Sequence, residues 1–102
     1  MRHFTVYAKP FKLDDLIETI AQFDPPVLLV EDVRGYGRQK GHLELYSGSE
    51  YSITFLPKVR LEFLAPAAQE RAIREAMAEA GRTGRIGDGK ILVREVRKLL
   101  EL

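Results

Sequence analysis

The apolar residues of this chain follow one order twice, and this repetition restricts the folds that the chain can adopt. A β-branched and aromatic run at 4–8 has the length of a strand, and apolar residues at helical spacing follow it over 13–20. Pro25 and Pro26 stop this helix, and a second strand-length apolar run covers 27–33. The first half is therefore predicted to be strand, helix, strand.

The second half repeats this order. Residues 53–55 and 59–64 are predicted to form a strand, and 91–93 a further one. Between them, Pro66 is expected to open a helix as a first-turn residue, and Gly81 to end it. The two halves together predict an α+β, ferredoxin-like βαβ–βαβ sandwich. Both helices of such a fold lie on one face of a small sheet, so the other face needs cover and an oligomer is expected.

Length and composition limit the class of protein. The 102 residues suit one domain, 1–102, and 16 Lys and Arg against 15 Asp and Glu give a net charge of +1. This charge argues against bulk electrostatic attraction to nucleic acid or to an anionic membrane. The absence of cysteine excludes disulfides and thiolate metal sites. With no apolar signal region and no segment of membrane-spanning length, we expect a cytoplasmic protein without direct membrane insertion.

A glycine-rich segment, 83–90, is the strongest local indication of function. Its three glycines let backbone N–H groups approach a ligand closely, and Lys90 at its end adds a full positive charge. From Gly84 the spacing is that of a P-loop, but Ile91 stands where a P-loop needs Ser or Thr, and a strand-type run follows. The segment therefore indicates phosphate binding outside a Walker A motif, or an ordinary tight turn between a helix and a strand.

The connection 34–51 is longer than its two flanking strands require. Connections of this length in compact domains are usually functional or disordered. This one carries more large apolar side chains than a solvated tail, which favours an arm that becomes ordered on a partner or ligand. These side chains are Tyr36, Leu43, Leu45, Tyr46 and Tyr51.

From Met1 to about Val93 the chain resembles the PII nitrogen-regulatory signal proteins. Three stretches carry the resemblance in order: 9–15, which reads KPFKLDD, 35–59, which contains GYGRQKGH, ELY, EY and FLPKV, and the glycine segment. The resemblance implies a ferredoxin-like homotrimer with ligands in the clefts between subunits. It also implies a long T-loop at about 37–55, a B-loop at about 82–90 and a shortened C-terminal tail at about 94–102.

The resemblance further implies a regulator, not an enzyme, that senses ATP or ADP together with 2-oxoglutarate. Gln39 would offer its side-chain carbonyl to a Mg²⁺ ion that bridges the two ligands, as suits a hard cation with oxygen ligands. By the family pattern, nucleotide binding falls to Arg38, Glu62, Gly87, Asp88, Gly89 and Lys90, and 2-oxoglutarate binding falls to Lys9, Gln39, Lys40 and Lys58.

In this family the T-loop docks onto ammonium channels, enzymes or regulators of nitrogen assimilation. The expected partner is therefore a nitrogen-assimilation enzyme, regulator or membrane transporter. Tyr51 matches a position that is uridylylated in some members, and Ser49 matches one that is phosphorylated in others. Negative charge added in a docking loop would repel or reshape a partner surface.

Some residues depart from the family pattern. Glu101 stands at the first position of an arginine pair that clamps phosphates in relatives, and the turn 25–29 has fewer hydroxyl groups and more bulk. Ser47 replaces an arginine that enters the ammonium pore. The alternative interpretation is a PII-like paralogue with weak or lost nucleotide binding that acts as a constitutive or modification-controlled interaction protein. The spacing in 93–100 also predicts an amphipathic turn in the tail.

Two other function classes are disfavoured. The sequence Arg-Gly-Tyr-Gly at 34–37 matches the start of an RNA-binding motif, but the aromatic strand residues that stack bases do not follow. A hydrolase is equally unsupported, because His3 and His42 are the only histidines and neither lies beside a nucleophile arrangement.

Overall fold

The computed structural model of the chain describes residues 1–36 and 55–102. Within them, two strand–helix–strand halves follow one another, as the sequence predicts, and the chain has the ferredoxin-like α+β fold. Short 3-10 helices, η1 and η3, precede the two α-helices. In chain order the elements are β1 (Arg2–Ala8), η1 (Pro10–Lys12), α1 (Leu13–Ala21), β2 (Leu28–Gly35), β3 (Leu56–Ala65), η3 (Ala67–Gln69), α3 (Glu70–Gly81) and β4 (Gly89–Glu95).

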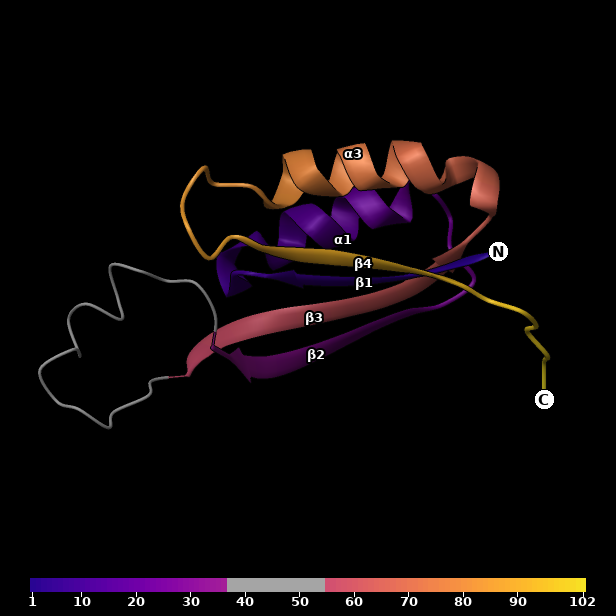
Figure 1. The fold of residues 1–102 in the computed structure, drawn as a ribbon, viewed down its shortest axis with the longest axis horizontal. Coiled ribbons are helices and arrows are strands. Elements are labelled where there is room, and N and C mark those ends of the chain that lie inside the picture. Colours follow the sequence, from indigo (N-terminus) through magenta and orange to yellow (C-terminus); the bar gives the residue numbers. More distant parts are fainter. Residues whose placement is uncertain (37–54) are drawn as a thin grey trace, which may run out of the picture.

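The four strands form one antiparallel sheet in the order β2–β3–β1–β4. Helices α1 and α3 lie side by side on one face of this sheet, so the molecule has two layers (Figure 1). The register pairs Phe4 of β1 with Phe63 of β3 and Val93 of β4. Directly paired residues share a face, so these three side chains all point toward the helices.

The core fills the space between the helices and the covered face of the sheet. The rings of Phe4 and Phe63 stack with centroids 5.0 Å apart and planes 6° apart. Every second side chain of a strand points toward the helices, and each helix turns one face toward the sheet. The apolar residues therefore recur at strand spacing in the strands and at helical spacing in the helices, and both patterns are visible in the sequence. The buried core consists of Phe4, Val6, Ala8, Leu16, Ile20, Val59, Leu61, Phe63, Ala65, Ile73 and Met77.

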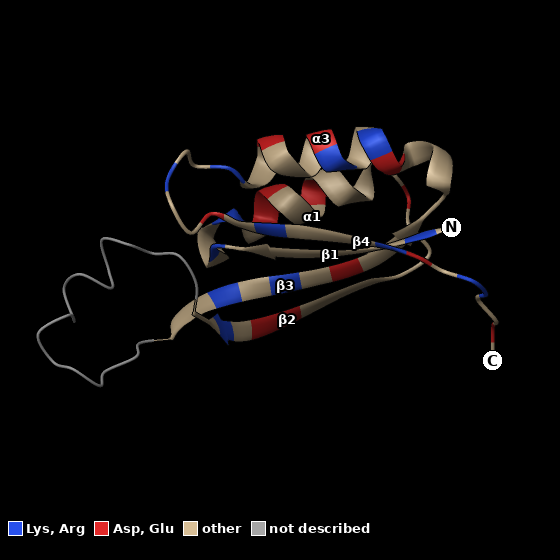
Figure 2. Cartoon of the chain, viewed as in Figure 1, with Lys and Arg blue, Asp and Glu red and all other residues tan. Residues whose placement is uncertain are grey.

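The opposite face of the sheet has no helix over it and is charged. Along β3, Lys58, Arg60 and Glu62 alternate with the buried residues, and Figure 2 shows the resulting blue and red bands on this strand. Arg60 donates a hydrogen bond from Nη2 to Oε1 of Glu31 on the neighbouring strand, at 2.6 Å. Leu92 of β4 is also exposed here. The predicted uncovered face is therefore present within the chain.

Two local predictions need correction. The strand expected at 53–55 and 59–64 continues without a break through 56–58 as β3, which starts at Leu56 after Phe55, and residues 53 and 54 lie outside the described residues. The strand accommodates Pro57 because β1 pairs with β3 only from Val59 onward, so Pro57 lies beside β2 alone. The amphipathic turn expected in the tail does not form. Residues 96–102 contain no helix, and Leu100 is exposed.

The two ends of the molecule differ in content. Figure 1 places both termini at one end, and at the other end it places the connection from α3 to β4. We call this connection, residues 82–88, the glycine loop. The end of β2 and the start of β3 lie at the same end as the glycine loop (Figure 1). In the described part of the chain, no helix is long and apolar enough to cross a membrane.

Candidate anion-binding site at the glycine loop

The backbone of the glycine loop requires glycine where it meets the sheet. Gly89 has φ of 140°, and a Cβ atom at this position would lie 1.8 Å from the carbonyl oxygen of Tyr7. Gly87 also has positive φ, 84°, a region that L-residues with a side chain rarely adopt. The predicted reason for these glycines, close approach of backbone groups to a ligand, stays a prediction, and at Gly89 the group that approaches closely is the chain's own β1.

The Asp88 side chain organises the glycine loop from inside. Its Oδ2 atom accepts hydrogen bonds from the backbone N–H groups of Thr83 and Gly84, each at 2.9 Å. Its Oδ1 atom accepts a hydrogen bond from the Thr83 hydroxyl and another from the Lys9 ammonium group, the latter at 3.1 Å. The hydrogen bond from the Thr83 side chain, with those from the backbone and Lys9, holds the pKa of Asp88 well below its usual range. The carboxylate of Asp88 is therefore ionised in the folded protein at neutral pH.

Two lysines, one just after β1 and one in β3, point at this loop. Lys9 follows β1 and donates to Thr83 Oγ1 at 3.3 Å as well as to Asp88. Lys58 of β3 donates from Nζ to the carbonyl oxygen of Gly87 at 2.5 Å. Burial lowers the pKa of Lys58, the nearby charge of Lys9 lowers it further, and Asp88 partly offsets both. One carboxylate thus faces two ammonium groups, which leaves an excess of positive charge.

A cleft of about 610 Å³ opens beside these groups on the uncovered side of the sheet. Four cationic residues contribute to its lining together with two glycines of the loop and its junction, and no acidic residue is among the described residues that line it. Its lining residues are Tyr7, Val33, Arg34, Gly35, Tyr36, Lys58, Arg60, Gly87, Gly89 and Lys90. Cations that converge with backbone groups in a concave site suit a ligand with phosphate or carboxylate groups.

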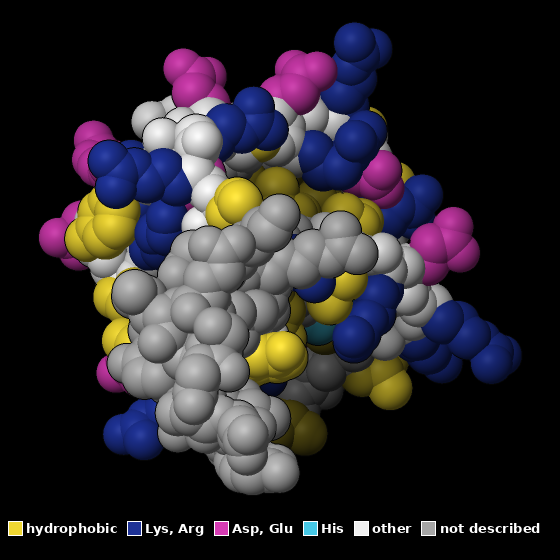
Figure 3. All heavy atoms as spheres, turned by 60° about the vertical axis from the view of Figure 1, so that its left-hand side comes forward, with side chains coloured by type: hydrophobic (Ala, Val, Ile, Leu, Met, Phe, Trp, Pro, Cys, Tyr) yellow, Lys and Arg dark blue, Asp and Glu magenta, His cyan; other side chains and the backbone are white. Residues whose placement is uncertain are grey.

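The surface around this end mixes cationic and apolar side chains. Figure 3 brings this end of the molecule forward and shows Lys and Arg side chains next to hydrophobic ones. Phe11 and Ile86 are exposed here, as are Tyr36 and Phe55, whose ring centroids lie 6.2 Å apart. Exposed apolar groups beside cations are typical of surfaces that contact another molecule.

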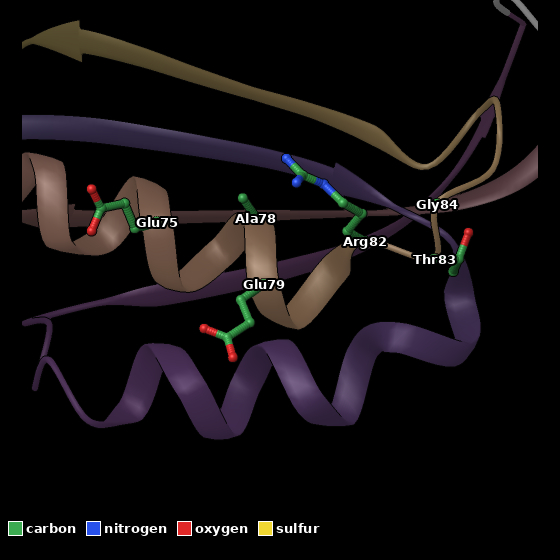
Figure 4. A pocket seen from close by; sticks show the side chains of 6 residues that line it. All are labelled: Glu75, Ala78, Glu79, Arg82, Thr83 and Gly84. Carbon is green, nitrogen blue, oxygen red and sulfur yellow. The ribbon is translucent and has the colours of Figure 1, made fainter.

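A second hollow, of about 640 Å³, lies at the C-terminal end of α3 and does not suit an anion. Figure 4 shows Glu75 and Glu79 projecting from α3, with Arg82 and Thr83 following the helix. Two carboxylates against one guanidinium group give this hollow the wrong sign for phosphate. The candidate anion site is therefore the cleft beside Lys58.

The structure brings together most of the predicted site residues that it describes. Lys9 binds the side chain of Asp88, and Lys58 binds the backbone carbonyl group of Gly87. The cleft beside the glycine loop is lined by Lys58, Gly87, Gly89 and Lys90, among others. Glu62 is separate. It lies further along β3, with its Oε1 atom 4.0 Å from Nε of Arg60, and it does not line the cleft. The other predicted positions, Arg38, Gln39, Lys40, Ser47, Ser49 and Tyr51, lie outside the described residues.

Sequence reasoning missed Thr83, Arg34 and Arg60 as members of this site. Thr83 had a local signal, because a Thr and an Asp around glycines after a helix are typical of side-chain-to-backbone bonding in turns. Arg34 and Arg60 had none, since their position in the cleft depends on the pairing of β2 with β3.

Known proteins with related sequences agree with this architecture. The family described as "Nitrogen regulatory protein P-II" matches residues 1–101 of the chain. A nitrogen regulatory protein P-II of Pasteurella multocida is 44% identical over 102 residues, which cover 100% of this chain and 91% of that protein. The nitrogen regulatory protein GlnK of Escherichia coli is 43% identical, and a P-II protein of Rhizobium meliloti is 42% identical, both with the same coverage. The chain therefore belongs to the nitrogen regulatory P-II family.

Proposed function

We propose that this protein is a cytoplasmic nitrogen-signalling regulator without catalytic turnover that senses ATP or ADP and 2-oxoglutarate. Membership of the P-II family supports the regulatory role. The observation that carries the ligand assignment is the convergence of Lys9 and Lys58 on the glycine loop, beside a cleft that is lined by cations. In this proposal, three chains form a homotrimer, whose subunit interfaces complete the clefts.

The two ligands would use different parts of the cleft. Lys90 and the backbone at 87–89 would hold nucleotide phosphates, and Lys58, with Lys9 nearby, would pair with a carboxylate of 2-oxoglutarate. Within residues 1–36 and 55–102, no group of three His, Asp or Glu side chains is arranged to hold a metal ion. The proposed Mg²⁺ ion would therefore rely on ligand oxygens and on Gln39, and it would supply charge neutralisation between the two ligands.

The regulatory output would pass through the T-loop. Its described flanks are Tyr36, which follows β2, and Phe55, which precedes β3. Tyr36 lines the same cleft as Gly87 of the glycine loop, and the ring centroids of Tyr36 and Phe55 lie 6.2 Å apart. A ligand that binds one T-loop state more tightly than another would shift the population toward that state and so change partner docking. The partner would be a nitrogen-assimilation enzyme, regulator or membrane transporter, and modification of Tyr51 or Ser49 would add negative charge to the docking surface.

Calorimetric titration of the full chain with ATP, 2-oxoglutarate and Mg²⁺ tests this function. We expect nucleotide binding, and 2-oxoglutarate binding only in the presence of Mg-ATP. The Lys58→Met variant should lose about 10- to 100-fold in 2-oxoglutarate affinity, the range for a hydrogen bond to a charged group. Lys12→Met, which removes the same charge near Phe11 at this end of the molecule, should retain affinity. Absence of binding to both nucleotides at millimolar concentration contradicts the proposal.

The alternative is a PII-like interaction protein with weak or lost nucleotide binding. Glu101 is exposed, and Val27 and Leu29 present apolar surface around the start of β2. Figure 1 places the C-terminal end far from the glycine loop of the same chain. Glu101 would therefore repel only a phosphate group that is bound at the glycine loop of a neighbouring subunit. Restored nucleotide binding in Glu101→Arg would show that only the clamp was lost, whereas no gain would implicate the turn 25–29.

A further inference from the structure

The glycine loop itself supplies oxygen ligands to both lysines of the site. Lys9 Nζ lies 3.1 Å from Asp88 Oδ1, and Lys58 Nζ lies 2.5 Å from the carbonyl oxygen of Gly87. These are a carboxylate oxygen and a carbonyl oxygen, the same kinds of atom that a 2-oxo dicarboxylate presents. Some of the N–H donors that an incoming anion would use are therefore already engaged by intramolecular contacts.

The two oxygens of Asp88 have separate tasks. Oδ2 accepts the backbone N–H groups of Thr83 and Gly84, which fixes the carboxylate to the loop. Oδ1 faces Lys9 and the Thr83 hydroxyl. Lys9 can thus leave Oδ1 while Oδ2 still holds the backbone in place. This division separates the electrostatic role of Asp88 from its role in the shape of the loop.

We propose that Asp88 is an internal competitor for the anionic ligand: its Oδ1 atom holds Lys9, as the Gly87 carbonyl holds Lys58, and ligand binding exchanges these contacts for ligand oxygens. This inference rests on the proposed function, which assigns the lysine pair to an anion. It adds a specificity rule. To displace these contacts, a ligand must attract the lysines more strongly than the single carboxylate of Asp88 does. Dianions and polyanions are therefore favoured over monoanions.

The exchange also couples the lysine pair to the glycine loop. Both lysine contacts end on adjacent loop residues, Gly87 and Asp88, and Lys9 also binds Thr83 at the start of the loop. An anion that takes the lysines removes three charge-assisted hydrogen bonds from the loop, which changes the electrostatic environment of the amides that would meet phosphate. Binding at one part of the cleft therefore alters affinity at the other, and this effect is reciprocal.

The Asp88→Asn variant of the full chain tests the proposal, with inorganic pyrophosphate as the probe in calorimetry at low salt. Asn keeps an oxygen acceptor for the amides of Thr83 and Gly84 but removes the charge that opposes the anion. We expect pyrophosphate to bind about tenfold more tightly, the effect of removing one like charge several ångströms away at intermediate dielectric. Asp14→Asn, which removes the same charge from an exposed position in the first turn of α1, should leave the affinity unchanged.

The sign of the change separates competition from a purely structural role, since loss of loop structure would weaken binding. In a Lys9→Gln background the gain from Asp88→Asn should largely disappear, because the contact that it relieves is absent. Equal or weaker pyrophosphate binding by the folded Asp88→Asn variant overturns the proposal, and so does an undiminished gain in the Lys9→Gln background.

A measurement on the wild-type chain covers the case in which Asp88→Asn does not fold. Titration with pyrophosphate should move the nitrogen resonance of the Lys9 ammonium group together with the amide resonances of Thr83 and Gly84. Unchanged resonances at saturation overturn the proposal. Pyrophosphate gives these results whether or not ATP and 2-oxoglutarate bind, so failure of the proposed function is recognised separately in the titrations with those ligands.

Discussion

The two faces of the sheet are built from the same strands but serve different purposes. On the covered face, Phe4, Leu61 and Phe63 are almost completely buried against the helices. On the uncovered face, the alternate positions of β3 carry Lys58 and Arg60, which line the candidate cleft. Because side chains alternate along a strand, each core residue fixes the direction of a charged neighbour. The core residues therefore position the charged residues of the site through the strand register.

The largest expected effect belongs to the covered face. Phe4→Ala removes a stacked ring from the core and should lower the free energy of unfolding by about 3–5 kcal/mol. The same change at Phe11, whose side chain is 70% exposed in η1, should cost less than about 1 kcal/mol. Urea denaturation followed by circular dichroism measures both. Similar losses for the two variants would contradict the assignment of the core to the covered face.

A somewhat smaller loss is expected where the glycine loop joins the sheet. Gly89→Ala places a methyl group against the Tyr7 carbonyl at φ of 140° and should cost about 2–3 kcal/mol, because the backbone must move to relieve the overlap. Gly84 also has positive φ, but no atom lies within 4 Å of an added Cβ, so Gly84→Ala should lower the free energy of unfolding by about 1 kcal/mol. Unfolding midpoints of the two variants check this order, and a milder effect at Gly89 would contradict the described junction.

The uncovered face should respond differently from the core, in a way that depends on protein concentration. Leu92 of β4 is 42% exposed in the single chain, so Leu92→Ala should cost about 1 kcal/mol or less in a monomer. If three copies cover this face, as we propose, the cost per chain rises with protein concentration, because association is linked to folding. Unfolding curves at micromolar and millimolar concentration, together with sedimentation, measure this. A cost that is independent of concentration would break the proposed trimer.

The sequence predicted the two-layer fold because both of its periodicities are strong. Helical spacing in α1 and α3 and alternation in β3 are local properties, and the structure confirms the elements that they indicate. The continuous strand through Pro57 was missed because the tolerance for proline depends on where β1 stops pairing. Where the bounds of a strand depend on its pairing with a neighbouring strand, they cannot be predicted from the residues of that strand alone.

The candidate site was predicted unequally. The glycine segment and Lys90 are contiguous in sequence, so their pattern by itself indicates an anion site. Lys9 and Lys58 are brought to the loop by the antiparallel register that places Ala8 opposite Val59, and residue patterns alone do not reveal this pairing. Only the resemblance to a known family connected them. The side-chain role of Asp88 was missed because it depends on the closure of the loop around the carboxylate.

The smallest expected effect concerns Asp88 and appears only in acid. Its pKa in the folded protein lies below the ordinary value of 3.8, so its hydrogen bonds stabilise the protein fully above that pH. As pH falls below 3.8 the unfolded chain takes up this proton first, and the stabilisation is progressively lost. The unfolding midpoint of the wild-type chain should therefore fall more steeply below about pH 4 than that of Asp88→Asn, which has no proton to bind. Asp14→Asn, in the exposed first turn of α1, should keep the steep wild-type profile. If the unfolding midpoints of wild type and Asp88→Asn fall in parallel with pH, the loop does not hold the carboxylate. The contrast between the apolar covered face and the site organised by charges would then lose its clearest electrostatic evidence.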